Sequence, residues 1–179
     1  MRARTPLSLR WWISRVRPIV LLLPWMVALG AAPQALIGQS APDFALPPAV
    51  SGDNVRLSEY RGQPVMLLFW SSSCGACAAQ LAALGRLYDT YHSAGLVVLG
   101  VSVDDDAQQA ERYARAHRSH FPLLLDQAKE VGRAYQINRL PTTVLIDRSG
   151  VVRYLNDDYR ANDRTYISQI RALLDDQGV

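Results

Sequence analysis

The sequence predicts an α/β fold, a three-layer sandwich of helices around a mixed central sheet. Apolar runs of strand length alternate with segments in which apolar residues recur at helical spacing. Such alternation requires a parallel sheet with right-handed crossovers, and a strand–turn–strand pattern near the C-terminus adds an antiparallel edge. The chain has 179 residues, 49% of them hydrophobic, which is enough for one domain with a core of ordinary size.

Residues 1–38 are predicted to form an export signal or membrane anchor, and residues 39–179 to form the folded domain. Five arginines lie in the first 17 residues, before an apolar run that begins at Ile19 and reaches Ile37 with one interruption at Gln34. This order predicts export, with the arginines left in the cytoplasm. The length fits both a cleaved signal and a tilted span. We therefore expect the domain on the periplasmic side of the bacterial inner membrane, either anchored or released.

The formal net charge of +3 belongs to this N-terminal segment. Without its five arginines, 14 of the 19 basic residues remain against 16 acidic ones. The domain itself is therefore slightly acidic, which excludes nucleic acid as an expected partner.

The domain should begin with an N-terminal β-hairpin extension followed by a central strand. Two short strands, 43–46 and 54–57, flank the turn signal Ser51-Gly52-Asp53. The continuous apolar run VMLLFW, residues 65–70, predicts a strand buried on both faces.

The middle of the domain should continue with a helix, a strand and a second helix. Apolar residues recur at helical spacing over 75–92, and Gly95 ends that helix before the apolar strand 96–103. One of Asp104, Asp105 and Asp106 is expected to cap a helix over 107–117.

The remainder should contain a further strand and helix, a β-hairpin and a terminal helix. The predicted elements are strand 121–126, helix 128–135, hairpin strands 142–147 and 151–155, and a helix capped by Asn162 or Asp163 that ends near Asp176.

The only two cysteines of the chain, Cys74 and Cys77, form a C-x-x-C pair that could staple the fold, bind a metal or exchange electrons. A bridge across three residues closes so small a loop that it removes little entropy from the unfolded chain. Zinc needs about four ligands, and three scattered histidines do not complete a site of known spacing. No metal is therefore expected, and redox exchange is favoured.

The position of the pair after a buried strand and at a helix start supports the redox interpretation. Backbone N–H groups and the helix dipole there stabilise a thiolate, so Cys74 is the expected nucleophile. Cys77 lies about one turn further along the same helix face, where it could resolve a mixed disulfide. A βα unit carrying C-x-x-C is a stronger signal than the motif alone.

A second candidate element is Pro141, which directly precedes the apolar strand TTVLID. Because proline cannot donate to a strand ladder, Pro141 marks either a simple strand start or a tight cis turn.

With WSSSCGAC followed by LPTTVLID, the chain resembles the thioredoxin superfamily. More closely, APDFAL, VRLSEYRGQPVMLLFW, VVLGVSVDD and LPTTVLIDRSGVV are similar in order to the TlpA/ResA-like group of membrane-anchored extracytoplasmic thiol–disulfide oxidoreductases. The resemblance covers the chain from about Ala41 to the C-terminus and implies a thioredoxin-like fold.

The resemblance implies that Pro141 is cis and faces the dithiol, and that the Leu140 backbone pairs with an extended substrate segment. It implies Cys74 as the exposed nucleophile and Cys77 as the resolving thiol, with this redox-active disulfide in place of any cofactor. Expected partners are an exported protein that carries a thiol or disulfide, such as apocytochrome c before haem attachment, and a membrane thiol reductase that supplies electrons.

Three departures from the group's pattern surround the dithiol, and the four residues Ser73, Gly75, Ala76 and Gln80 are expected to tune its redox chemistry. Ser73 replaces the usual Trp, and Gly75-Ala76 replaces Gly-Pro between the cysteines. Gln80 stands where many relatives have Glu, and an amide cannot accept a proton.

Two other functions remain as alternatives. A peroxiredoxin-type thiol peroxidase would carry a P-x-x-x-T/S-x-x-C pattern, but Leu67 occupies the proline position here. The chain could also be a non-catalytic binding or chaperone module that retains a thioredoxin-like fold.

Overall fold

The computed structural model describes residues 36–158 and 164–176. Most of the predicted N-terminal segment, and the cap residues Asn162 and Asp163, lie outside these ranges. Across the described residues, no helix has both the length and the apolar character that a membrane crossing requires.

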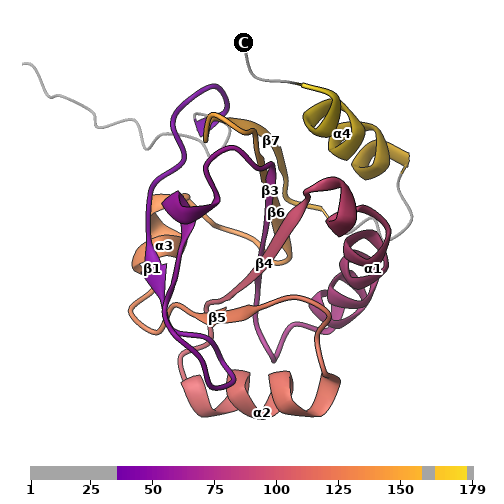
Figure 1. Cartoon of the computed structure of the whole chain (residues 1–179). Helices are drawn as coiled ribbons and strands as arrows, with labels where there is room; N and C mark the ends of the chain where they lie inside the picture. The colour runs from indigo at the N-terminus through magenta and orange to yellow at the C-terminus, as the bar shows by residue number, and fades with distance from the viewer. Residues whose placement is uncertain (1–35, 159–163, 177–179) are drawn as a thin grey trace, which may run out of the picture. The chain divides into compact units, whose positions relative to one another are not determined.

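A five-stranded mixed sheet forms the centre of the domain, in the spatial order β5-β4-β3-β6-β7 (Figure 1). β3 pairs with β4, and β4 with β5, in parallel, whereas β6 pairs antiparallel with both β3 and β7. The predicted mixed sheet is thereby confirmed. Its strands are β3 (Val65–Trp70), β4 (Val97–Ser102), β5 (Leu123–Leu125), β6 (Thr142–Ile146) and β7 (Val152–Asn156).

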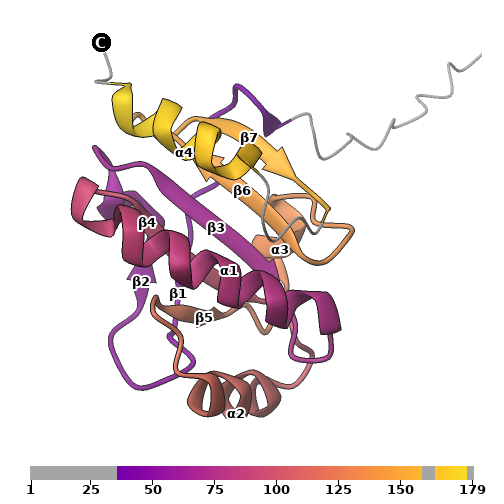
Figure 2. The ribbon, with the colours of Figure 1, turned by 90° about the vertical axis from the view of Figure 1, so that its right-hand side faces the viewer.

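The sheet is covered on both faces, which gives the predicted three layers. Figure 2 shows the long helix α1 and the terminal helix α4 crossing one face, with α3 behind the sheet and α2 below β5. A separate antiparallel pair, β1 and β2, forms the expected N-terminal hairpin. These elements are β1 (Ala45–Leu46), β2 (Val55–Arg56), α1 (Gly75–Tyr91), α2 (Ala107–His117), α3 (Glu130–Ala134) and α4 (Arg164–Asp175).

Alternation along β3 divides the core into two clusters. Met66, Leu68 and Trp70 pack toward α1, α2 and α4, whereas Leu67 and Phe69 pack toward α3 and the hairpin. All six residues of β3 are buried, because the strand is paired on both edges and covered on both faces. The dithiol therefore follows a strand that is held on every side.

Several elements are shorter than predicted. β1 begins at Ala45 rather than at residue 43, and it ends at Leu46 as predicted, because Pro47 and Pro48 follow and prolines cannot donate to a ladder. Helix α3 begins at Glu130 rather than near residue 128, since Lys129 has a left-handed backbone with φ of 54°. Among the three aspartates proposed as the cap of α2, Asp106 fills the role, and its carboxylate accepts a hydrogen bond from the Gln108 backbone.

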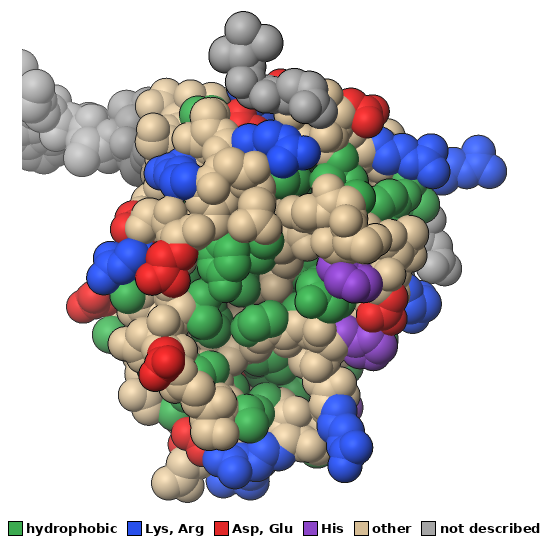
Figure 3. Space-filling model, viewed as in Figure 1, with side chains coloured by type: hydrophobic (Ala, Val, Ile, Leu, Met, Phe, Trp, Pro, Cys, Tyr) green, Lys and Arg blue, Asp and Glu red, His purple; other side chains and the backbone are tan. Residues whose placement is uncertain are grey.

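Hydrophobic side chains gather near the middle of the face shown in Figure 3, with charged side chains around its margin. A hollow of about 660 Å³ lies between the hairpin and the end of α2, and Val50, Arg118 and Phe121 line it.

Candidate active site

Cys74 and Cys77 are joined by a disulfide at the start of α1, with their Cα atoms 5.2 Å apart. Cys74 is the N-cap of the helix, and its sulfur accepts a hydrogen bond of 3.2 Å from the Cys77 backbone N–H. The position at a helix start is confirmed. A hydrogen bond and a helix dipole aimed at one sulfur favour its thiolate over its thiol once the disulfide is reduced.

The two sulfur-bearing side chains differ in exposure. Cys74 is partly exposed, whereas Cys77 is completely buried against the cluster that contains Leu81 and Leu84. A partner's sulfur can approach only an accessible side chain. The exposure of the pair therefore supports the predicted roles of Cys74 as nucleophile and Cys77 as resolving thiol.

Pro141 lies beside the same end of the sheet, and its peptide bond with Leu140 is cis, as the resemblance implies. The antiparallel register of β3 and β6 pairs Phe69 with Thr142. Continuing this register by one residue places Pro141 opposite Trp70, and Trp70 is four residues before Cys74. The Thr142 hydroxyl donates a hydrogen bond of 2.8 Å to the Arg139 carbonyl and fixes the segment that precedes the strand.

Leu140, directly before Pro141, is partly exposed and has open backbone groups. It packs against both core clusters, whereas Pro141 is buried. Among the described residues, the backbone N–H and C=O of Leu140 have no hydrogen-bond partner. An open backbone donor and acceptor beside the dithiol is what the addition of a substrate strand requires.

A buried carboxylate, Asp104, supports the loop that leads to Cys74. Its oxygens accept hydrogen bonds from the hydroxyls of Ser71, Ser72 and Ser102 at 2.7, 2.8 and 2.7 Å, and from the Ser72 backbone at 3.0 Å. Burial raises the pKa of Asp104, but the hydrogen bonds from Ser102, Ser71 and Ser72 outweigh it and hold the pKa below its ordinary value. The carboxylate therefore stays ionised and joins the ends of β3 and β4.

The same carboxylate fixes the direction of the hydrogen bond made by Ser73. Ser71 donates its single hydroxyl proton to Asp104, so in the 2.9 Å contact between the Ser71 and Ser73 oxygens the donor must be Ser73. The Ser73 hydroxyl proton is thus engaged and points toward Ser71, which leaves only oxygen lone pairs for other contacts. At neutral pH Ser73 therefore provides an acceptor beside Cys74.

The two residues between the cysteines are exposed. A Cβ atom placed on Gly75 would meet nothing within 4 Å, and Ala76 also lies open to solvent. Space alone would therefore accept a larger dipeptide here. Their tuning effect on the redox chemistry stays a prediction.

Gln80 lies one turn beyond Cys77 on α1 and is only 1% exposed. Within the described part of the chain, its side-chain oxygen Oε1 has no hydrogen-bond partner. A buried acceptor without a donor costs about 1–3 kcal/mol. An amide thus occupies a buried position one turn from Cys77, where an ionised carboxylate would be still more costly.

Ser73, Cys74, Cys77 and the Leu140-Pro141 segment lie at one end of the sheet, and their roles in exchange stay a prediction. Sequence reasoning missed the role of Asp104, which it treated only as a helix-cap candidate. A signal was present, because Ser71 and Asp104 each follow a strand of a parallel pair, and carboxyl ends of parallel strands meet at one edge.

A thioredoxin-like fold that presents a C-x-x-C disulfide at a helix start, beside a cis-proline, defines the class of the protein as a thiol–disulfide oxidoreductase. Residues 37–155 match the model of the AhpC/TSA family, and the chain belongs to that family. The thiol-disulfide oxidoreductase ResA of Geobacillus kaustophilus is 36% identical over 119 residues, which span 66% of this chain and 68% of that protein. ResA of Bacillus subtilis is 30% identical over 115 residues, 64% of each chain.

Solved structures give the same assignment. The crystal structure of a proposed thiol:disulfide interchange protein DsbE from Chlorobium tepidum aligns with a TM-score of 0.73 at 32% identity, covering 77% of this chain and 97% of that one. The solution structure of a proposed protein disulfide isomerase from Bacteroides thetaiotaomicron aligns with a TM-score of 0.67 at 27% identity, covering 76% and 86%. The chain is therefore a protein-disulfide oxidoreductase of the ResA/DsbE type.

Proposed function

We propose that this oxidoreductase works as a reductase of disulfides in exported proteins, on the periplasmic side of the bacterial inner membrane. The observation that carries the proposal is the pairing of a partly exposed, helix-capping Cys74 with a fully buried Cys77. Apocytochrome c before haem attachment is the example of a substrate that the family resemblance suggests. The basic and apolar residues 1–38 support export and tethering, and a membrane thiol reductase would supply the electrons.

The proposed reaction begins with the reduced dithiol. The Cys74 thiolate attacks one sulfur of the substrate disulfide, forming a mixed disulfide and releasing the other substrate sulfur as a thiolate. Cys77 then loses its proton and attacks the Cys74 sulfur, which releases the second substrate thiolate and forms the Cys74–Cys77 disulfide. Two electrons pass to the substrate, two protons follow through solvent, and the disulfide awaits reduction by the electron donor. The reaction needs no bound cofactor.

Removal of a proton from Cys77 needs a base, and Gln80 cannot serve as one. The Asp104 carboxylate is bound by its serines and has a lowered pKa, which makes it a weak base. We propose that water takes the proton, reaching the site beside the partly exposed Cys74.

The test is to trap the mixed disulfide. The full-length Cys77→Ser chain should form covalent adducts with its substrates in cells, because the resolving sulfur is gone, and mass spectrometry would identify them. Cys74→Ser should trap nothing and show no exchange, and it serves as the matched control. Equal adduct yields from both variants, or none from Cys77→Ser, would refute the proposed order of attack.

The direction of electron flow needs a separate measurement. A reductase should have a reduction potential more negative than about −200 mV, measured by equilibration with glutathione. A potential near that of a strong oxidant, about −120 mV, would reverse the proposed direction.

The two alternatives make different predictions. A peroxidase would turn over peroxide rapidly at Cys74, but Leu67, at the position of the peroxiredoxin proline, is a fully buried residue in the middle of β3. A non-catalytic binding module would still support its host after Cys74→Ser, whereas an oxidoreductase would not.

A further inference from the structure

A groove of about 500 Å³ lies beside Leu140, on the side of the sheet that carries α3. Its walls come from α3, from the segment that leads to Pro141 and from the residue that follows β4. Among the residues that the structure describes, no acidic residue lines it. The residues that line it include Val103, Lys129, Arg133, Arg139 and Leu140.

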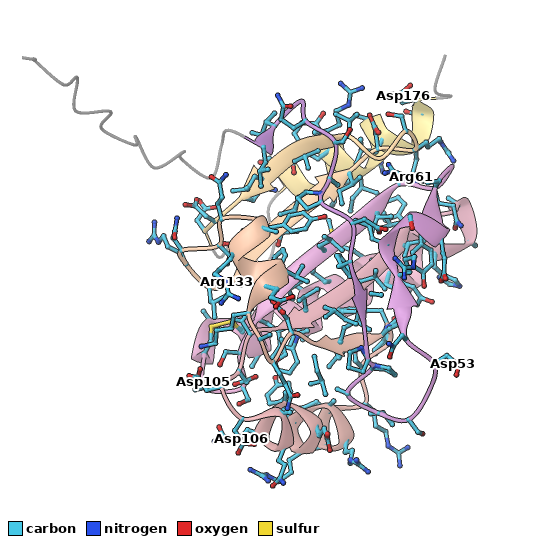
Figure 4. All side chains as sticks on the ribbon, turned by 90° about the vertical axis from the view of Figure 1, so that its left-hand side faces the viewer. Asp53, Arg61, Asp105, Asp106, Arg133 and Asp176 are labelled. Atoms are coloured by element: carbon cyan, nitrogen blue, oxygen red, sulfur yellow. A yellow bond between two sulfur atoms is a disulfide. The ribbon has the colours of Figure 1, made fainter. Side chains whose placement is uncertain are left out.

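Two of these residues connect the groove to the dithiol. The Val103 backbone donates a hydrogen bond of 3.0 Å to the Trp70 carbonyl, at the end of the strand that leads to Cys74. Leu140 packs against the core cluster that Cys74 contacts and also against the cluster beneath α3. The groove therefore continues the surface on which a substrate strand would pair with Leu140. Figure 4 shows Arg133 on the same side of the ribbon as the disulfide, with Asp53 on the opposite side.

The groove carries uncompensated positive charge. Lys129 forms an ion pair with Asp105, which neutralises it. Arg133 and Arg139 are exposed, and within residues 36–158 and 164–176 their side chains have no ion pair or hydrogen bond. Two guanidinium groups without partners provide planar, forked donors that match a carboxylate.

We propose that this groove recognises an acidic side chain in the substrate, on the extended segment that flanks the target disulfide. The inference rests on the proposed function and specifies its substrate class. A segment that pairs with the open backbone of Leu140 presents alternate side chains to the groove. Arg133 and Arg139 would bind the carboxylate of such a side chain, which favours acidic sequences and fixes the direction in which the segment lies.

A polypeptide fits these observations better than a polyanion does. The groove is bounded by Leu140 and Val103, which offer apolar contact, and Leu140 adds its open backbone rather than another cation. Asp105 and Asp106 are exposed nearby on the chain that follows Val103, and Figure 4 shows both on the side of the disulfide. Both aspartates are in ion pairs, Asp105 with Lys129 and Asp106 with Arg112. Among the described residues, Arg133 and Arg139 are therefore the unpaired charges of the groove lining, and two guanidinium groups suit the one or two carboxylates of a short peptide better than the many charges of a nucleic acid or an anionic membrane.

The test compares disulfide peptides that differ only in charge. The probes are synthetic peptides with one internal C-x-x-C disulfide, and an Asp is placed at each of about four positions on either flank, with Asn as the isosteric reference. The reduced full-length chain is mixed with each peptide, quenched with acid and analysed for the rate constant of disulfide reduction. The ratio of the second-order rate constant for each Asp peptide to that for its Asn partner is the measured quantity.

For wild type, we expect a ratio of about three to five at the best position, falling toward one at high salt. The double variant Arg133→Gln, Arg139→Gln should give a ratio near one at low salt as well. Arg139→Glu should favour peptides with Lys in place of Asp. Arg118→Gln is the matched control. Arg118 is an exposed arginine at the C-terminal end of α2, and it lines the hollow of about 660 Å³ instead of this groove. The Arg118→Gln variant should therefore keep the wild-type ratio.

The outcomes separate this inference from the proposed function. If wild type reduces the Asp and Asn peptides at equal rates at every position, the groove does not select acidic segments and the inference is wrong. If wild type reduces none of the peptides although its dithiol is intact, the proposed reductase function fails, and the inference fails with it. Urea unfolding of each variant gives its free energy of unfolding. A variant that is as stable as wild type but has lost the rate ratio has lost recognition and not folding.

Discussion

The carboxylate of Asp104 accepts a hydrogen bond of 2.7 Å from the hydroxyl of Ser71, across 33 residues of sequence. This contact joins the loop before the dithiol to the end of the neighbouring parallel strand. Because the hydroxyl and the backbone N–H of Ser72 donate to the same carboxylate, the loop is fixed by several bonds to one charged group. The position of Cys74 therefore depends on a residue outside the C-x-x-C motif.

Replacing Asp104 by Asn should destabilise the oxidised protein by about 2 kcal/mol at pH 7, since hydrogen bonds to a charged group are lost at a buried site. The pKa of Asp104 is lowered in the folded state, so its stabilising contribution is complete above the unfolded pKa of about 3.9 and is lost as the pH falls through the folded pKa. The difference between wild type and variant should therefore shrink below about pH 4. Urea unfolding at pH 7 and pH 3 measures it. Asp105→Asn is the control, because the Asp105 side chain is 91% exposed.

Replacing Gln80 by Glu should destabilise the protein in a pH-dependent way. The side chain is buried, so the pKa of the new carboxyl should lie above its unfolded value of about 4.3. Destabilisation should therefore appear as the pH rises above about 4.3 and grow until the folded pKa is passed. Unfolding at pH 4 and pH 8 gives the test, and equal losses at both values would contradict it. Gln80→Met, which is neutral and of similar size, should lack the pH dependence and should remove the cost of the unpaired Oε1.

Replacing Thr142 by Val should weaken the binding of extended substrates. The substitution keeps the shape of this buried side chain but removes its hydrogen bond to the Arg139 carbonyl, so the Leu140 segment is held less firmly. We expect KM for a disulfide peptide to rise about three- to tenfold, the range for one ordinary hydrogen bond, with a smaller change in kcat. Thr142→Ser retains the hydroxyl and should restore most of the affinity. Similar KM values for the Ser and Val variants would show that the hydrogen bond is not responsible.

Arg148 should be important for holding the C-terminal helix. Its guanidinium donates to the carbonyls of Leu174 and Asp176 at the end of α4, and to Gly62 on the loop before β3. Arg148→Met should cost about 1 kcal/mol, the scale of one partly exposed hydrogen-bonded charge, and speed hydrogen exchange in the last turn of α4. Arg148→Lys cannot form the same fork and should restore little of this protection. Unchanged exchange in α4 would mean that packing alone holds the helix.

The fold could be predicted in most of its parts because the core pattern is strong. The strand VMLLFW is buried along its whole length, so composition alone sets its bounds at Val65 and Trp70. The start of α1 at Gly75 follows from the same pattern, together with helical spacing. The start of α3 could not be predicted, because it depends on the left-handed backbone at Lys129, a residue whose type gives no indication of such a conformation.

The candidate site was predictable where its residues are adjacent in sequence, and only there. Cys74, Cys77 and Leu140-Pro141 are recognisable from local motifs. Asp104 and the groove arginines depend on which strands are neighbours and on how α3 turns back toward Pro141, and these are properties of the assembled sheet. From the sequence, Asp104 is a helix-cap candidate, because it lies between a strand and a helix. Its role in holding Ser71 and Ser72 becomes visible only when β3 is known to pair with β4.

The complete burial of Cys77 beside a partly exposed Cys74 has a kinetic consequence. Only one sulfur is open to the outside, so an electron donor and an electron acceptor have to use the same docking position in turn. Turnover should follow a ping-pong scheme, in which each partner inhibits the other by occupying the entrance. The rate in the cell would then depend on how quickly a finished partner departs as much as on the exchange step itself.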